Sequence, residues 1–185
     1  RVFEVIFGME PSGQIDFARD TLVITQIRLP RLLLGAAVGA ALAASGAVMQ
    51  GLFRNPLADP GLIGVSSGAG FSAAVAIVLG GRFLPDAATK LPFAFLPMAA
   101  FVGALTSTLI LYVVASRGGR TSMAIMLLAG IAFAALAGAG TGWLAYISDD
   151  RQLHDLTFWW MGSLGGAKWS KVVVVVPMVL PELVA

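Results

Sequence analysis

The sequence contains no cysteine, a single histidine and few charged residues. The absence of cysteine excludes disulfide bonds and thiolate metal ligands, and it leaves the compartment open. His154 stands beside Asp155 with no second histidine at ligand spacing, so we expect a polar interfacial residue there and no metal site. The net charge is only +2, and no basic patch indicates binding to nucleic acid.

The scarcity of charge is the most informative absence. Charged residues make up 12% of the 185 residues and hydrophobic residues 58%, with a mean hydropathy of +0.88. No Asp, Glu, Lys or Arg occurs in the windows 32–53, 60–81, 91–116 and 121–148. About 20 apolar residues cross a bilayer as a helix. Core helices of a large soluble protein are the alternative, but nearly every candidate helix is apolar all round, which favours a membrane protein.

We therefore expect an all-α bundle of transmembrane helices in one domain. Residues 1–27 mix charged and apolar positions and predict an extramembrane lead-in. The expected spans are about 29–53, 60–80, 92–116, 121–147 and 169–185, and a short amphipathic helix is expected at about 151–161. Pro30 suits the first turn of the first span, and Asp150 can cap the short helix.

The two ends of the chain suggest a piece of a longer membrane protein. The sequence begins at Arg1 instead of Met, and it ends inside an apolar run. Pro177 and Pro181 interrupt that run, followed by Glu182. We expect a last helix that is kinked and nearing its exit, or an end that is not native.

The stretch RNPLADPG predicts a sharp reversal between the first two spans. Pro56 cannot continue a helix, and Asn55 before it is pushed away from helical geometry. Asp59 can accept the free amide hydrogens of a new helix, and Pro60 has the right φ for its first turn. Arg54 and Asp59 then stand at the negative and positive ends of two helix dipoles. On local physics alone, a well-capped turn explains all of these residues.

Small residues recur four positions apart along the predicted spans. In lipid, such spacing lets helix backbones approach closely and marks packed faces. With 22 glycines in the chain, each pair is a weak signal alone, but their density predicts a compact bundle. The pairs are Gly35 with Gly39, Gly64 with Gly68, and Gly138 with Gly142.

Enzyme motifs in the chain lack the context they need. The run GVSSG matches a nucleophile elbow with Ser66 as nucleophile, but no strand is predicted before it, and His154 is predicted on the other membrane face. The run GAGFSA at 68–73 fits a loose dinucleotide fingerprint without a βαβ unit to hold it. No charged residue lies in the middle of the first four spans, which argues against a secondary transporter or channel coupled to ions.

Charge alone leaves the orientation open. The side with residues 1–28 and the loops 82–90 and 149–168 carries most of the Lys and Arg, but it also carries most of the acids. The opposite side has three arginines in two very short turns. The positive-inside rule is most reliable for short loops, so these arginines weakly favour the opposite side as cytoplasmic. All four tryptophans fall near the first side, as in an aromatic belt.

One long run carries a family resemblance: QIRLPRLLLGAAVGAALAASGAVMQGLFRNPLADPGLIGVSSGAG. Together with LLAG at 127–130 and LTFWWMGSLGGAKW at 156–169, it resembles the FecCD permease subunits of ABC importers for iron chelates, haem and vitamin B12. The resemblance covers nearly all of residues 22–172. It implies a type II permease fold of ten helices, of which this chain supplies about five, in a bacterial inner membrane.

The resemblance also implies roles for particular residues. Arg28 and Arg31 of RLPR would stand on the periplasmic surface and receive acidic residues of a substrate-binding protein; headgroup anchoring is the alternative. A cytoplasmic gate would comprise Asn55, Leu57, Ser122, Met123 and Ala124. The last three depart from the polar run typical of the vitamin B12 importers, which puts the gate chemistry and the cargo in doubt. The fifth family helix, 121–147 here, would line the pathway.

The implied partners are a second permease copy in a homodimer, cytoplasmic ATPase subunits, a periplasmic substrate-binding protein and the lipid bilayer. The permease itself is expected to be no enzyme and to bind no cofactor, because ATP and Mg²⁺ belong to the ATPase. The coupling helices of the family lie beyond the residues present here. The pattern LTFWWMGSL is most similar to haem importers, so haem is the first expected cargo, a ferric siderophore the second and vitamin B12 the alternative.

Overall fold

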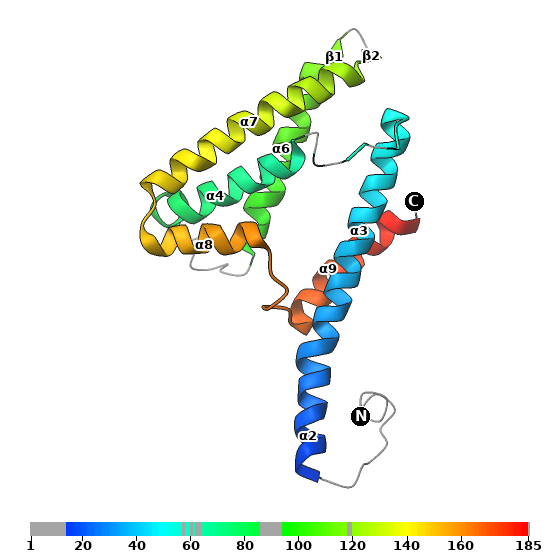
Figure 1. Cartoon of the computed structure of the whole chain (residues 1–185), viewed down its shortest axis with the longest axis vertical. Coiled ribbons are helices and arrows are strands. Elements are labelled where there is room, and N and C mark those ends of the chain that lie inside the picture. The colour runs from blue at the N-terminus through cyan, green and yellow to red at the C-terminus, as the bar shows by residue number, and fades with distance from the viewer. Residues whose placement is uncertain are drawn as a thin grey trace. The chain divides into compact units, whose positions relative to one another are not determined.

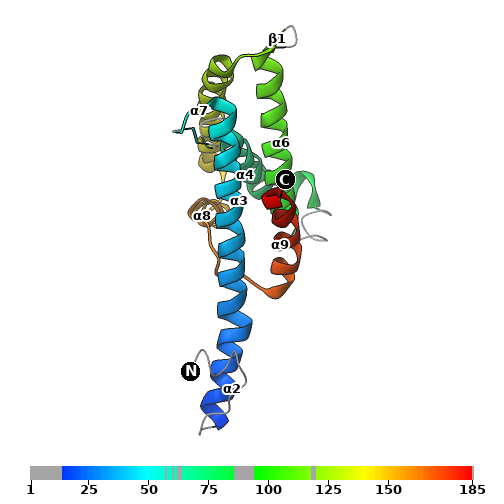
Figure 2. The ribbon, with the colours of Figure 1, turned by 90° about the vertical axis from the view of Figure 1, so that its right-hand side faces the viewer.

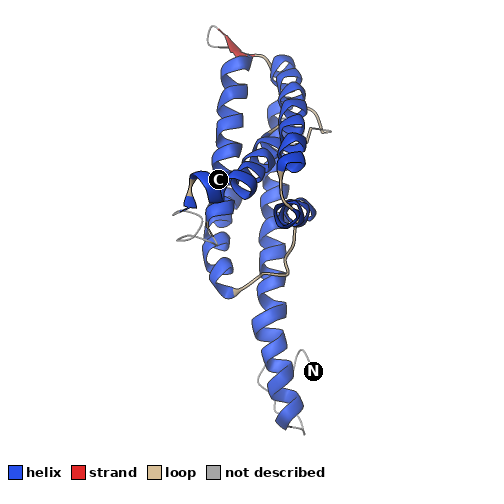
Figure 3. Ribbon diagram, turned by 90° about the vertical axis from the view of Figure 1, so that its left-hand side faces the viewer, coloured by secondary structure: helices blue, strands red, loops and turns tan. Residues whose placement is uncertain are grey.

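The structure is a computed structural model that describes residues 14–56, 58–59, 61, 64–85, 94–117 and 120–184. Within these residues the backbone is almost entirely helical, with one short β hairpin (Figure 3). The expected all-α class is confirmed. The chain divides into two compact units, residues 1–47 with 163–185 and residues 48–162, which are described separately. The expectation of a single permease domain stays a prediction.

The first unit contains one continuous helical run. Its parts are α2 (Gln14–Val23), the π-helical turn η1 (Ile24–Arg28) and α3 (Leu29–Phe53), which reaches into the second unit. Pro30 lies in the first turn of α3, as predicted, but α3 continues from η1 without a break. Proline has no N–H and its ring crowds the preceding turn, and here that turn is widened: the Leu29 N–H bonds to the Ile24 carbonyl, five residues back.

This run is longer than a bilayer is thick. The candidate membrane span within it, Arg19–Phe53, has 35 residues, which at about 1.5 Å per residue is well over the ~30 Å of a hydrocarbon core. Part of the run must therefore lie outside the membrane. The charge-free window begins only at residue 32, so the N-terminal part is the better candidate. The extramembrane lead-in stays a prediction, although residues 14–27 within it are helical.

Helix α9 (Trp169–Val184) lies beside α3 in the first unit (Figures 1 and 2). Leu34 of α3 packs with Ala167 and Val172 in a small buried cluster. The backbone of α9 stays helical past Pro177 and Pro181, so these prolines do not end it.

The second unit is built around α4 (Val65–Phe83). Helices α6 (Phe95–Ala115), α7 (Met123–Ile147) and α8 (Asp150–Met161) pack against it. Its largest apolar cluster joins α4, α7 and α8 through Ala74, Val78, Leu144 and Leu156. Among the described residues, four helices are long and apolar enough to cross a membrane: Arg19–Phe53, α4, α6 and α7.

The helix boundaries differ from the predicted spans at several ends. Helix α4 begins five residues after the predicted start at Pro60, because its N-cap is Gly64 in a left-handed conformation with φ of 78°. It also continues to Phe83, three residues past the predicted end. Between α6 and α7, the strands β1 (Ser116–Arg117) and β2 (Arg120–Thr121) form a small antiparallel hairpin.

The small-residue pairs pack only in part as predicted. A Cβ atom added at Gly39, Gly138 or Gly142 would meet no other atom within 4 Å, so these three positions are open in the described chain. Gly140, also on α7, does pack against a neighbouring helix: an added Cβ there would lie 2.6 Å from the Phe71 ring. Spacing alone could not identify the buried face, because α7 is rich in small residues all round.

The tightest crossing joins α4 and α6. A Cβ added at Gly68 would lie 2.9 Å from the Gly103 carbonyl oxygen and 2.6 Å from the Ser107 Cβ. The reverse contact is equally close, between a Cβ added at Gly103 and the Ser72 side chain. The two helices thus interlock through paired Gly-xxx-Ser motifs, and the sequence prediction had found only the Gly68 half.

Helix α8 has a complete capping box, one residue earlier than predicted. The Asp149 carboxylate accepts the Gln152 N–H at 2.8 Å, and the Gln152 side chain accepts the Asp149 N–H at 3.2 Å. Asp149 is the N-cap, and Asp150 lies in the first turn. The Gln152 amide also donates to the Val78 carbonyl at 3.1 Å, which ties α8 to α4.

Candidate functional site

The two arginines expected to dock a partner lie on either side of Pro30. Arg28 ends the π-helical turn, Arg31 lies in the first turn of α3, and both are exposed. Arg31 also holds the first unit together, because its Nη2 donates to the Gly165 carbonyl at 3.3 Å. The RLPR segment thus presents two guanidinium groups, one of which is hydrogen-bonded to the loop between α8 and α9.

Trp169 satisfies a carbonyl that the π-helical turn and Pro30 leave free. The Thr25 carbonyl would normally accept from Leu29, but the Leu29 N–H bonds to Ile24, and Pro30 has no N–H to offer instead. The Trp169 Nε1–H donates to this carbonyl at 2.9 Å. Sequence reasoning missed this role. In a regular α-helix Pro30 would free the Gln26 carbonyl, and nothing in the sequence predicts the π-helical turn that frees Thr25 or pairs it with a tryptophan 144 residues away.

The turn after α3 is a Schellman motif with an unusual residue in it. The Arg54 N–H bonds to the Gly51 carbonyl at 3.3 Å, and the Asn55 N–H to the Gln50 carbonyl at 3.2 Å. Arg54 has a φ of 48°, in the left-handed region where helix ends usually place glycine. Arg54, Asn55 and Pro56 are all exposed.

The second half of this turn is closed by Asp59. Its carboxylate accepts the Gly61 N–H at 2.6 Å, and the Ala58 N–H bonds to the Asn55 carbonyl at 3.1 Å. Asp59 therefore caps the end of the connection and not the first turn of α4. Leu57 and Pro60 lie outside the described residues, so the gate role of Leu57 and the capping role of Pro60 stay predictions.

The other predicted gate segment begins α7. Ser122 is the N-cap, and its hydroxyl accepts the Ile125 N–H at 3.4 Å; the Ser122 N–H bonds to the Ala115 carbonyl at 3.0 Å. Met123 is half-buried and Ala124 is exposed. The common role of these residues and Asn55 in a gate stays a prediction.

The beginning of α4 is nevertheless held against α7. A Cβ added at Gly64 would lie 3.0 Å from the Gly130 carbonyl oxygen and 3.3 Å from the Phe133 ring. Any side chain at this position would also have to adopt the left-handed conformation of Gly64. The connection after α3 therefore enters α4 at a position fixed by α7.

The geometry gives no support to the nucleophile-elbow interpretation of GVSSG. Ser66 is exposed in the first turn of α4, and the described residues just before it form no strand. His154 is exposed on α8, where its Nδ1 lies 3.7 Å from an Asp155 carboxylate oxygen and its ring stacks on Phe158. These contacts fit a polar residue on the surface of α8.

The whole sequence, residues 1–185, matches the FecCD transport family. The chain belongs to this family. It is 47% identical over 166 residues to the hemin transport system permease protein HmuU of Yersinia pestis, covering 85% of this chain and 46% of that relative. It is 46% identical over 165 residues to the vitamin B12 import system permease protein BtuC of Escherichia coli O157:H7, covering 88% of this chain and 48% of that relative.

A solved transporter structure has a similar fold. The fold is similar, with a TM-score of 0.74 and 30% sequence identity, to a transporter reported in an inward-facing conformation and assigned to the metal-chelate type of ABC transporter. The similarity covers 95% of this chain and 51% of that one. The chain thus spans about half the length of the relatives it matches. Its family and its apolar helices make it a protein of the inner membrane.

Proposed function

We propose that this chain is part of the permease subunit of an ATP-driven importer that moves a large metal chelate into the cytoplasm. The observation that carries the proposal is the FecCD match over residues 1–185, on a chain with four helices of spanning length among its described residues. ATP and Mg²⁺ would bind to a separate ATPase, so the permease would not itself be an enzyme. A second permease copy would complete the pathway as a homodimer.

Haem is the proposed cargo, with a ferric siderophore second. The support is the pattern LTFWWMGSL at 156–164, which resembles haem permeases, and the relative that is named for hemin transport. A vitamin B12 permease is 46% identical and favours the alternative cargo almost equally. A transport measurement distinguishes these cargoes.

Uptake in cells with this gene inactivated tests both the class and the cargo. We expect loss of radiolabelled haem uptake, with ferric siderophore and vitamin B12 uptake retained, and restoration by the intact gene. Vanadate should block the restored uptake, because ABC importers depend on ATP hydrolysis. Uptake that resists vanadate but collapses with a protonophore would mean a secondary transporter. If only vitamin B12 uptake were lost, vitamin B12 and not haem would be the cargo.

Arg28 and Arg31 are proposed to receive acidic side chains of the substrate-binding protein. Both are exposed, and guanidinium groups pair well with carboxylates. Arg28→Glu tests docking directly, because no other role is assigned to this side chain. Arg31→Glu would also remove the hydrogen bond to Gly165, so it needs the neutral Arg31→Gln as a control. If the Arg28→Glu variant still captured the loaded binding protein as well as the wild type does, Arg28 would have no role in docking.

The gate is proposed to form from the Schellman turn and the start of α7. Asn55 lies at a fixed helix end, and Ser122 fixes the first turn of α7. A gate needs residues held on rigid helix ends, and these two have that support. Leu57, Met123 and Ala124 complete the proposed set.

A further inference from the structure

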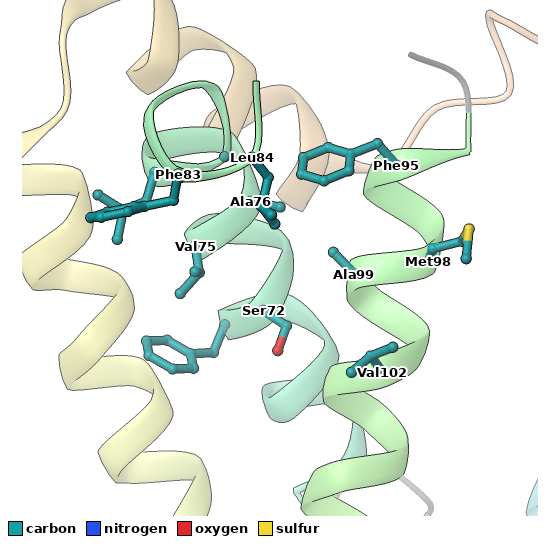
Figure 4. Close-up of a pocket in the computed structure, with 12 residues that line it drawn as sticks. Ser72, Val75, Ala76, Phe83, Leu84, Phe95, Met98, Ala99 and Val102 are labelled. Carbon is teal, nitrogen blue, oxygen red and sulfur yellow. The ribbon is translucent and has the colours of Figure 1, made fainter. Parts of the chain in front are cut away.

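An apolar groove with a volume of about 610 Å³ lies between α4 and α6 in the second unit (Figure 4). One wall is α4 from Ser72 to Phe83, and the other is α6 from Phe95 to Val102. Among the described residues that line the groove, Ser72 alone has a polar side chain. Phe95 can lie against the α4 backbone because Gly80 has no side chain: a Cβ there would be 2.8 Å from the Phe95 ring.

The length of the groove matches one leaflet of a bilayer. From Ser72 to Phe83 the chain advances eleven residues, or roughly 16 Å at 1.5 Å per residue, which is close to half of a ~30 Å hydrocarbon core. A further transmembrane helix would need a groove about twice as long. Because α4 and α6 are both of spanning length and composition, this apolar face lies at the depth of the lipid hydrocarbon chains. One acyl chain of a lipid therefore fits the groove better than a helix does.

The side chain of Arg82 supplies a positive charge near the end of the groove where a lipid headgroup would lie. Arg82 is in the last turn of α4 and is exposed. It follows Val75, which lines the groove, by seven residues, so the two share a flank of the helix. Neither α4 nor α6 contains an acidic residue that could neutralise it. A basic residue beside an apolar groove between transmembrane helices suits an anionic headgroup.

We propose that this groove binds one acyl chain of an anionic phospholipid, with the lipid phosphate at Arg82. The apolar walls supply affinity for any acyl chain, and the guanidinium supplies the preference for negative charge. The site requires that α4 and α6 span the membrane and that no other helix of the permease covers this face, and it does not depend on the cargo or on the docking partner.

Photocrosslinking of the purified protein in lipid vesicles tests the proposal. The probes are phosphatidylglycerol and phosphatidylethanolamine, each with a diazirine on one acyl chain, and the labelled peptides are mapped by mass spectrometry. We expect labelling of residues 72–83 and 95–102, with phosphatidylglycerol favoured by about fivefold, the factor that corresponds to about 1 kcal/mol for one basic residue near a membrane surface.

Two variants separate the acyl chain from the headgroup. Arg82→Gln should remove the preference for phosphatidylglycerol while the groove still labels with both lipids. Ala99→Phe should fill the groove and reduce labelling by both. Val113→Phe, at an exposed position near the other end of α6, is the matched control and should leave labelling unchanged.

Two results would overturn the proposal. Equal labelling by both lipids that Arg82→Gln does not alter would mean that Arg82 selects no headgroup. Crosslinks from the groove to protein, with no lipid labelling there, would mean that a second copy or another segment of the permease covers this face.

Discussion

The crossing of α4 and α6 gives the sharpest test of the packing. Gly68→Ala places a Cβ 2.9 Å from the Gly103 carbonyl oxygen and 2.6 Å from the Ser107 Cβ. Ordinary contacts between such atoms are longer, and neither atom is the far end of a flexible side chain, so the two helices must separate. Overpacking of this kind costs about 1–3 kcal/mol in free energy of unfolding.

The matched control is Gly138→Ala, which also replaces a glycine inside a spanning helix. An added Cβ there would meet no atom of the described residues within 4 Å. Alanine is favoured over glycine in a helix by about 0.5–1 kcal/mol, so this variant should be stabilised. The two variants are expected to change the free energy of unfolding in opposite directions. Changes in expression or in the micelle would affect both variants alike, so they could not produce this difference.

Unfolding in mixed micelles, followed by far-UV circular dichroism against increasing SDS, measures both variants. We expect Gly68→Ala to unfold at a lower SDS fraction than the wild type, and Gly138→Ala at a higher one. Equal shifts for the two variants, or stabilisation by Gly68→Ala, would refute the close approach of the backbones.

Three further predictions concern local hydrogen bonds and backbone strain, measured by the same unfolding assay. Trp169→Phe keeps the ring but removes the donor to the Thr25 carbonyl, and should cost about 1 kcal/mol; a change no larger than that of the exposed Trp143→Phe would contradict the role of the indole N–H. Arg54→Gly should be more stable than Arg54→Ala by about 1 kcal/mol, because only glycine relieves the left-handed conformation while both lose the charge; equal stability would argue against strain at this position. Asp149→Ala removes the N-cap of α8 and should cost about 1 kcal/mol, more than Asp150→Ala, which removes only a charge near the helix dipole; the reverse order would restore Asp150 as the cap.

Four of the five predicted spans correspond to helices that are long and apolar enough to cross a membrane, while α9 has 16 residues and is not among them in the described chain. These four were predictable because a helix in the hydrocarbon core of a bilayer needs a window without charged residues. The sequence was less reliable at helix ends. Pro30 suggested a helix start, but the η1 turn lets the helix pass through it. Asp59 with Pro60 suggested another helix start, but α4 begins after its N-cap Gly64. The left-handed conformation of Gly64 and its contact with α7 depend on the folded chain and could not be predicted from the sequence.

The candidate site was predictable only where a motif carried it. Arg28, Arg31 and Asn55 came from the family resemblance, and the structure finds all three exposed. The Trp169 to Thr25 hydrogen bond and the Gly103–Ser107 half of the helix crossing depend on contacts between distant segments. No local pattern encodes which segment will lie opposite.

Cysteine labelling from the two sides of the membrane tests the central claim, an importer permease with RLPR outside and RNPLADPG inside. The chain has no cysteine, so Arg28→Cys and Asn55→Cys are clean reporters. In intact cells, a membrane-impermeant maleimide should label Arg28→Cys and spare Asn55→Cys; in inside-out vesicles it should do the reverse. Labelling of both positions from the same side would contradict the proposed orientation and the roles that depend on it.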